Sequence, residues 1–341
     1  MMKKLLIYTS AVLMLAACNR PAPRHSTDSD FKTEVMIKTT PVKDQGDNQF
    51  CWVYAMLATI ESEHLMMGDS VNLSTDYVIR MVLADQARQY YFSGGRHQIS
   101  MRGMGAMLTH YIETYGAMPY DSYYSRKPVN YNVLSRKLAR VVDAQHSLSS
   151  LDVQTNELFD HFIEFMPKIV FMLGAEYTPL EFAHSVYKHD EFTAFTSFTH
   201  HPFNQKFALE VPDNLMHDEF LNIPIDTLMS RVEHSLRSGH PVCWEGDTSE
   251  EGFSFERGVA ITRNPQPCSQ AIRQREFESL HTTDDHCMEL IGIAHDRHDR
   301  LYFIAKNSWG TANPYGGMMY LSSNYVRMKT IAVYMKKNSK D

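Results

Sequence analysis

Two blocks of residues near opposite ends of the chain constrain its fold more than any other feature of the sequence. The first block contains Gln45 and, six residues later, the pair Cys51-Trp52. The second contains His286 and, after a further strand-like run, Asn307. A cysteine acts as a nucleophile when a base takes its proton and a third group orients that base. If these residues act together, the chain must fold so that segments 235 positions apart meet.

The residues that follow the cysteine predict a buried helix. Its apolar residues recur at near-helical spacing, at Val53, Met56, Leu57 and Ile60. The pattern stops at Gly68, a residue typical of helix ends. Because Cys51 lies in the first turn, the positive end of the helix dipole lowers its pKa and favours the thiolate. The runs 285–293 and 302–311 are apolar, β-branched and aromatic, and they predict two strands.

Each polar residue of the two blocks has one expected role. His286 takes the Cys51 proton, and Asn307 hydrogen-bonds the other imidazole nitrogen. Trp309 shields that bond from water, and Gln45 donates its amide to an oxyanion beside the Cys51 backbone N–H. A lone cysteine is more often a buried structural thiol. The ordered set of residues weighs against that interpretation here.

In these motifs and their order the chain resembles the papain-like cysteine peptidases, the C1 family. The resemblance implies an α+β fold of two lobes, with Cys51 in a helical lobe and with His286 and Asn307 in a β-rich lobe. It implies that Cys51 is the nucleophile, His286 the general base and acid, Asn307 the orienting residue and Gln45 the oxyanion donor. It also implies a peptide substrate in the cleft between the lobes, and no cofactor.

About 100 residues more than in papain-type peptidases separate the cysteine from the histidine. Helical patterns fill much of this segment, at Leu134, Leu138, Val141 and Val142 and then at Leu158, Phe162 and Phe165. The run Thr178-Pro179-Leu180-Glu181 is a capping box with proline at the first helical position. We therefore expect an inserted helical region over about 125–235. This insertion and the block 178–182 make the chain similar to the bleomycin hydrolase and aminopeptidase C branch.

The first residues are typical of a sorting signal. Lys3 and Lys4 precede an apolar run from Leu5 to Ala17, which is too short to span a bilayer and suits a signal peptide. Small residues before Cys18 resemble the bacterial lipobox, in which the cysteine is freed by cleavage and acylated. An ordinary signal peptide with an incidental cysteine is the alternative.

The predicted organisation follows from these features. It consists of a lipoprotein signal peptide (1–17), a tether (18–37), a papain-like peptidase domain (38–336) and a C-terminal tail (337–341). We expect the protein to be exported and lipid-anchored through Cys18 to a bacterial membrane, on the periplasmic side or at the cell surface.

Charge and motif content argue against two other kinds of site. Lys and Arg number 33 against 40 Asp and Glu, and this net charge of −7 lacks the basic excess of a nucleic-acid-binding protein. The 17 histidines suggest a metal, but neither His200-His201 nor the group 295–299 belongs to a zinc motif such as HExxH. We therefore predict no nucleic-acid partner and no metal.

Substrate contacts are expected at a glycine pair and at one tryptophan. In relatives a Gly-Gly pair lets the substrate backbone pair with an exposed strand, and Gly94-Gly95 is the candidate here. Gly103 and Gly105 compete for this role, and a flexible loop is the plain alternative. Trp309 is the third expected substrate-binding residue.

The predicted function is hydrolysis of peptide bonds by a Cys-His-Asn thiolate mechanism, in an aminopeptidase that acts on peptides. Bleomycin hydrolases have a longer tail that enters the cleft and contacts the substrate N-terminus, whereas 34 residues follow Asn307 here. An endopeptidase of the same chemistry therefore remains open, as does a surface lipoprotein that binds peptides without turnover. Relatives form hexamers, so the resemblance extends to a homo-oligomer.

Overall fold

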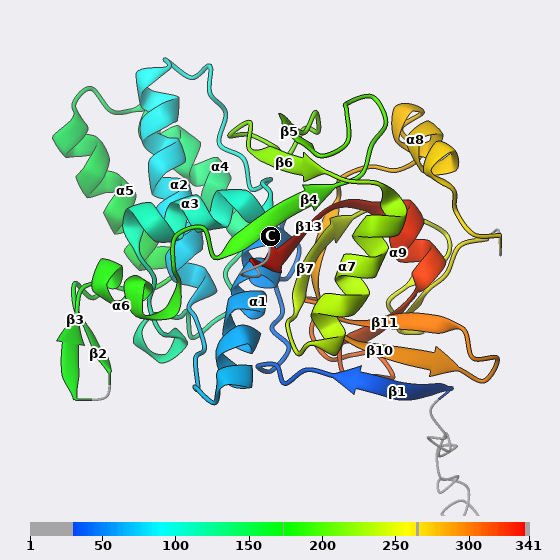
Figure 1. The fold of residues 1–341 in the computed structure, drawn as a ribbon. Coiled ribbons are helices and arrows are strands. Elements are labelled where there is room, and N and C mark those ends of the chain that lie inside the picture. The colour runs from blue at the N-terminus through cyan, green and yellow to red at the C-terminus, as the bar shows by residue number, and fades with distance from the viewer. Residues whose placement is uncertain (1–29, 173, 264–265, 338–341) are drawn as a thin grey trace, which may run out of the picture.

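The computed structural model describes residues 30–172, 174–263 and 266–337, and these form two lobes (Figure 1). The helical lobe contains α1 (Cys51–Met67), α2 (Thr75–Phe92), α3 (Gly105–Tyr115), the 3-10 helix η1 (Tyr120–Ser122), α4 (Tyr131–Asp143), α5 (Leu148–Phe162), the hairpin of β2 (Val170–Met172) and β3 (Ala175–Tyr177), and α6 (Pro179–Val186). The β-rich lobe contains β1 (Phe31–Met36), β4 (Phe192–Thr196), β5 (Gln205–Ala208), β6 (Glu219–Asn222), α7 (Ile225–Arg237), β7 (Val242–Gly246), β8 (Phe253–Ser254), β9 (Val259–Ala260), α8 (Gln270–Glu278), β10 (His286–Asp296), β11 (Leu301–Lys306), β12 (Met318–Ser322), α9 (Ser323–Lys329) and β13 (Thr330–Lys336). In Figure 1, α1 lies between the two lobes.

One sheet organises the β-rich lobe. Its strand order is β5-β6-β4-β13-β7-β10-β11-β12-β9-β8, and β1 pairs with β10 beside this path. Strands β10 and β11 are antiparallel, with Glu289 opposite Lys306. The first residue of β10 and the residue that follows β11 therefore lie at the same end of the pair. These two residues are His286 and Asn307.

Helix α1 is buried along most of its length. Its first 14 residues, Cys51 to His64, are all buried. Helices α2 and α3 contact it from the helical lobe, and β7 and β10 contact it from the β-rich lobe. The helix ends at Gly68, whose φ of 95° lies in the left-handed region that glycine adopts at little cost. Both lobes thus pack on the helix that begins with the cysteine.

Most of the elements expected from the sequence are present. The fold is α+β with two lobes, and the predicted helix runs from Cys51 to the residue before Gly68. The first helical pattern of the insertion is α4, and the second is α5 as far as Phe162. Phe165, which the second pattern also placed in the helix, lies beyond its end and is exposed. The capping box at the start of α6 is formed in both directions between Thr178 and Glu181.

Two predicted boundaries differ from the structure. Residues 31–36, expected in the tether, form β1 and pair with β10, and Phe31 stacks on Tyr320 at 4.1 Å between ring centroids. The insertion at 125–235 is not only helical, because it also contains β2 to β6, and β4 joins the main sheet beside β13. These strands have three to five residues, too few to carry a clear alternation. The predicted signal peptide, Cys18 and residues 338–341 lie outside the described residues.

A buried arginine joins α2 to the insertion, and its removal should destabilise the protein. Arg80 is 2% exposed and donates hydrogen bonds to Asp160 (2.7 Å), Asn156 (2.9 Å) and Tyr123 (2.9 Å). We expect Arg80→Ala to lower the free energy of unfolding by at least about 2 kcal/mol, because several charge-assisted hydrogen bonds are lost at once. Denaturant unfolding followed by circular dichroism measures this change.

Arg88→Ala is the matched control. Arg88 also joins α2 to α5, through Asp152, but this ion pair is exposed to solvent. Arg88→Ala should lower the free energy of unfolding by less than about 1 kcal/mol. Equal losses in the two variants would show that the burial of Arg80 contributes nothing.

Candidate active site

The imidazole of His286 is held by Asn307. Nε2 of His286 lies 2.8 Å from Oδ1 of Asn307, which also accepts the backbone N–H of Ser308 at 2.7 Å. Because Oδ1 is an acceptor, Nε2 carries the hydrogen, and Nδ1 is the nitrogen that can exchange a proton with a thiol. The ring of Trp309 covers this pair, with its centroid 4.5 Å from that of His286.

The thiol of Cys51 begins α1 and interacts with His286. The hydrogen bond with Cys287 lowers the pKa of Cys51 most, burial raises it, and the hydrogen bond and charge of His286 lower it further, to well below its ordinary value. Burial lowers the pKa of His286, but the hydrogen bond and charge of Cys51 and the hydrogen bond with Asn307 raise it overall. These opposite shifts favour a thiolate–imidazolium pair.

Gln45 is fixed beside this pair by the residue after Asn307. Its Oε1 accepts the Ser308 hydroxyl at 2.5 Å, and its backbone N–H donates to the Ser308 carbonyl at 2.8 Å. Its Nε2 donates one hydrogen to the carbonyl of Asn48 at 2.7 Å. The second hydrogen of that amide is available to donate a hydrogen bond to an oxyanion.

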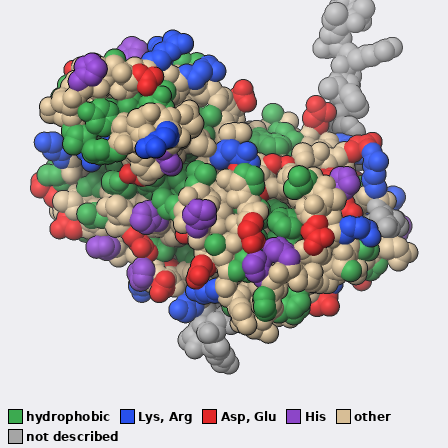
Figure 2. Space-filling model, turned by 90° about the horizontal axis from the view of Figure 1, so that it is seen from above, with side chains coloured by type: hydrophobic (Ala, Val, Ile, Leu, Met, Phe, Trp, Pro, Cys, Tyr) green, Lys and Arg blue, Asp and Glu red, His purple; other side chains and the backbone are tan. Residues whose placement is uncertain are grey.

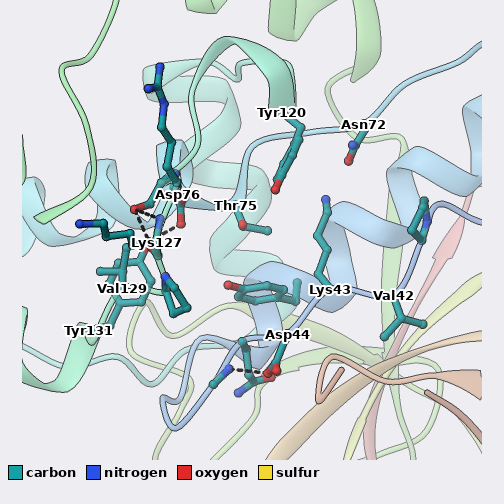
Figure 3. Close-up of a pocket in the computed structure, with 17 residues that line it drawn as sticks. Val42, Lys43, Asp44, Asn72, Thr75, Asp76, Tyr120, Lys127, Val129 and Tyr131 are labelled. Atoms are coloured by element: carbon teal, nitrogen blue, oxygen red, sulfur yellow. Dashed lines mark hydrogen bonds between the residues drawn. The ribbon is translucent and has the colours of Figure 1, made fainter. Parts of the chain in front are cut away.

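A cavity of about 590 Å³ adjoins the segment that carries Gln45. Figure 3 shows Lys43, Tyr120 and Asp76 among the residues around it. Lys43 is already paired with Glu61 at 2.8 Å, and burial raises the pKa of Asp76. No sequence motif pointed to this cavity.

A second polar group lies behind the nucleophile, and the sequence analysis missed it. Cys287, the residue after His286, donates its thiol to Oε1 of Glu245 at 3.2 Å. The hydroxyl of Tyr334 donates to Oε2 of the same carboxyl at 2.8 Å. Burial raises the pKa of Glu245 to about 8, so it is largely protonated at neutral pH. A glutamate directly after the apolar run 242–244 was the available signal.

The glycines expected to contact substrate lie in two different settings. Gly94 and Gly95 end α2 in left-handed conformations, and their backbone N–H groups bond to Tyr91 and Tyr90. Gly103 lies against Trp52, where a Cβ would come within 2.8 Å of the indole ring. The structure thus brings the segment at Gly103 to the catalytic helix, whereas a substrate contact at Gly94 and Gly95 stays a prediction.

The densest histidine group is poorly suited to a metal. Histidines are scattered over the face shown in Figure 2, and among the described residues one group, His200, His201 and Glu210, brings ligand atoms within 4.8 Å of one another. The amide of Gln274 donates to Nδ1 of His200, while its Oε1 accepts the N–H of Thr199. Nε2 of His200 therefore carries a hydrogen and donates it to Glu210, so it has no lone pair for a metal.

Comparison with known proteins identifies the family. A sequence model described as the peptidase C1-like family matches residues 170–340, half of the chain. The chain belongs to the peptidase C1-like family. This match confirms the resemblance drawn from the sequence motifs. The activity class of the peptidase is that of a cysteine peptidase. No curated protein matches its sequence.

Solved structures support the same fold. PepW from Lactobacillus rhamnosis superposes on the peptidase with a TM-score of 0.67 and 15% identity, covering 90% of this chain and 82% of PepW. Bromelain from Ananas comosus, in complex with the E64 inhibitor, gives a TM-score of 0.42 and 15% identity, covering 88% of this chain and 94% of bromelain. The PepW comparison shows the papain-like fold of the peptidase.

The N-terminus of the peptidase matches a second model. The prokaryotic membrane lipoprotein lipid attachment site matches residues 2–19, which include Cys18. Among the described residues, none of the helices combines the length and the apolar character needed to cross a bilayer. The match supports export and a lipid anchor for the peptidase.

The shifted pKa values of Cys51 and His286 predict an unusually reactive thiol. At about pH 6 an ordinary thiol with a pKa of about 8.5 is under 1% ionised. Because the pKa of Cys51 is lowered, we expect iodoacetamide to alkylate it rapidly at that pH. Alkylation rates measured by mass spectrometry across pH test this expectation.

Two variants serve as controls for the alkylation. His286→Ala should move the reactive midpoint to higher pH, since it removes the imidazolium. Cys51→Ala should remove the fast phase, because burial raises the pKa of Cys243, Cys268 and Cys287. A wild-type rate that follows ordinary thiol ionisation would contradict the assigned ion pair.

Proposed function

We propose that this peptidase is an aminopeptidase that hydrolyses peptides with a Cys51-His286-Asn307 mechanism. The observation that carries the proposal is the 2.8 Å bond between His286 and Asn307, with the imidazole facing a thiol at the start of a buried helix. A nucleophile, its base and an orienting group in this order are what acyl transfer through a thioester needs.

The reaction follows from these positions. The thiolate of Cys51 attacks the carbonyl carbon of the peptide bond, and the backbone N–H of Cys51 and the amide of Gln45 stabilise the oxyanion. The imidazolium of His286 gives its proton to the leaving amine as the C–N bond breaks. Water, deprotonated by His286, then attacks the thioester, and the carboxylic acid leaves as Cys51 regains its thiolate.

The aminopeptidase mode is supported by the likeness of the middle segments to the aminopeptidase C branch. An endopeptidase of the same chemistry is the second candidate, since the Cys51-His286-Asn307 chemistry is the same for a peptide bond inside a longer chain. A peptide library digested by the mature protein and read by mass spectrometry separates the two. Removal of single N-terminal residues supports the proposal, and internal cleavage of N-acetylated peptides contradicts the aminopeptidase mode.

Substitution of the catalytic residues should affect turnover to different degrees. Cys51→Ala should abolish hydrolysis with the fold retained, whereas Asn307→Ala should lower kcat and leave some activity, because His286 remains without its fixed orientation. Gln45→Ala should cost about 10²–10³-fold in kcat. Steady-state kinetics with a fluorogenic aminoacyl amide measure all three.

Ser308→Ala is the control for the glutamine. It removes the bond to Oε1 of Gln45 but keeps the amide donor, so its loss should be smaller. Wild-type turnover in Cys51→Ala would mean that the protein is no cysteine peptidase. Absence of turnover in the wild type, with peptide binding retained, would support the non-catalytic lipoprotein instead.

Anchoring is proposed through acylation of Cys18, on the periplasmic side or at the cell surface. The lipid attachment match at residues 2–19 supports this, and acyl chains would supply the membrane affinity that an acidic chain lacks. Cys18→Ser should release the protein from membranes or stall its processing, as fractionation and intact mass show. A wild-type protein that is soluble, or intact at Met1, would refute the anchor.

A further inference from the structure

The segment between β5 and β6, residues 209–218, crosses from the β-rich lobe to the helical lobe. Leu209 is 2% exposed and belongs to the core that α1 to α6 build, and Val211 and Met216 pack against the same core. In Figure 1 the turn between β5 and β6 lies above the upper end of α1, beside the segment that leads from α2 to α3. Three apolar side chains thus hold a β-lobe segment on the opposite lobe.

An ion pair fastens this segment close to the nucleophile. Asp213 pairs with Nε of Arg102, in the segment before α3. The residue before Arg102 is Met101, whose carbonyl accepts the indole N–H of Trp52 at 3.0 Å, and Trp52 follows Cys51 directly. The link between Asp213 and Arg102 therefore bridges the two lobes beside the start of α1.

Three buried carboxyl groups lie on segments that adjoin Cys51 and His286. Asp213 lies on the crossing segment, Glu245 on β7 beneath Cys287, and Asp284 two residues before His286. Burial raises the pKa of Asp213 to about 6, against the opposing effect of Arg102, and the charge of Cys51 contributes to the rise. Burial also raises the pKa of Asp284, and the charges of Glu245, Asp213 and Cys51 raise it further. Asp213 is held by Arg102, next to the residue that bonds Trp52, and Asp284 stands two residues before His286, so both aspartates belong to segments that adjoin the candidate active site.

Asp284 has no partner for one of its oxygens. Its side chain is 4% exposed, and Oδ2 forms no hydrogen bond among the described residues. A buried carboxyl oxygen without a donor is costly, and it is satisfied at once by a cation that carries N–H groups. Oδ2 of Asp284 is therefore free to accept a hydrogen bond from a positively charged group of a ligand.

We propose that Asp213 and Asp284 bind the α-ammonium group of the substrate, and that residues 209–218 close the cleft beyond it. The proposal rests on the aminopeptidase function proposed above and names the residues that would enforce it. In an aminopeptidase substrate the ammonium lies one residue from the bond that is cut, so its receptor must lie beside the nucleophile. An N-acetyl group brings no positive charge to Asp213 and to the unpartnered Oδ2 of Asp284, which disfavours blocked peptides.

The test compares free and blocked substrates in charge-removing variants. Asp213→Asn and Asp284→Asn are each assayed with a leucyl-anilide and its N-acetyl form. We expect the ratio of kcat/KM between free and acetylated substrate to fall at least about tenfold in each variant, mostly through KM for the free form. Asp152→Asn, which removes a carboxylate from a solvent-exposed ion pair with Arg88, should leave the ratio unchanged.

Two further outcomes separate this proposal from its rivals. If both substrates lose activity equally, the acids are structural and the assignment is wrong. If N-acetyl-lysyl substrates are weakened and free-amino substrates are not, the site binds a basic side chain, which also overturns it. Two acids on different elements keep the test valid if one variant fails to fold, as the unfolding midpoint shows.

A truncation after Lys337 tests the C-terminal residues as the alternative receptor. We expect it to leave the ratio unchanged, and a gain of activity on acetylated peptides would assign recognition to the tail and overturn the proposal. If the wild type cuts free and acetylated substrates equally, the aminopeptidase function itself fails. If the wild type discriminates and neither Asp variant changes the ratio, this assignment alone fails.

Discussion

Two carboxylates buried in the middle of α1 join the parts of the molecule that form the site. Glu61 and Glu63 are 0% and 2% exposed, and a buried carboxylate is tolerated only with charged and hydrogen-bonding partners. Their partners come from separate segments: Thr40, Lys43, Leu73, His240 and Lys336. The loop that leads to Gln45 and strand β13, the last strand in the sequence, are thereby both bound to the helix that begins with Cys51. Satisfying two charges aligns the two lobes.

The three residues after β11 position the side chains of the candidate active site. Asn307 holds the imidazole, Ser308 holds the amide of Gln45, and Trp309 covers the ring of His286. These side chains come from consecutive positions, so a single backbone path positions the proposed base His286, the proposed oxyanion donor Gln45 and the ring of Trp309. The antiparallel register of β10 and β11 places that path beside His286.

Negative charge near the nucleophile connects catalysis with substrate charge. The lowered pKa of Cys51 and the raised pKa of His286 favour an ion pair, and the charge of Cys51 contributes to the raised pKa values of Glu245, Asp213 and Asp284, in each of which burial is the largest cause. Protonation keeps most of this cluster neutral while no cation is present. A bound ammonium would let the carboxyls ionise, so binding energy from the substrate N-terminus would be available next to the bond that reacts.

The sequence by itself determined the features that depend on chain neighbours. The helix from Cys51 to Met67, the capping box of α6, the strand that begins with His286 and the strand that ends just before Asn307 follow from apolar spacing and residue types within a few positions. The expected chemistry of Cys51, His286 and Asn307 could be predicted from the sequence because a thiol, an imidazole and an amide each suit one role in acyl transfer.

The tertiary structure alone decided three interactions. They are the pairing of β1 with β10, the hydrogen bonds that Cys287 and Tyr334 donate to Glu245, and the ion pair between Arg102 and Asp213. Each of these contacts joins residues that lie from 42 to more than 200 positions apart in the sequence. Such contacts form because a buried polar group takes whichever partner the packed lobes bring within reach, and local spacing carries no record of that partner.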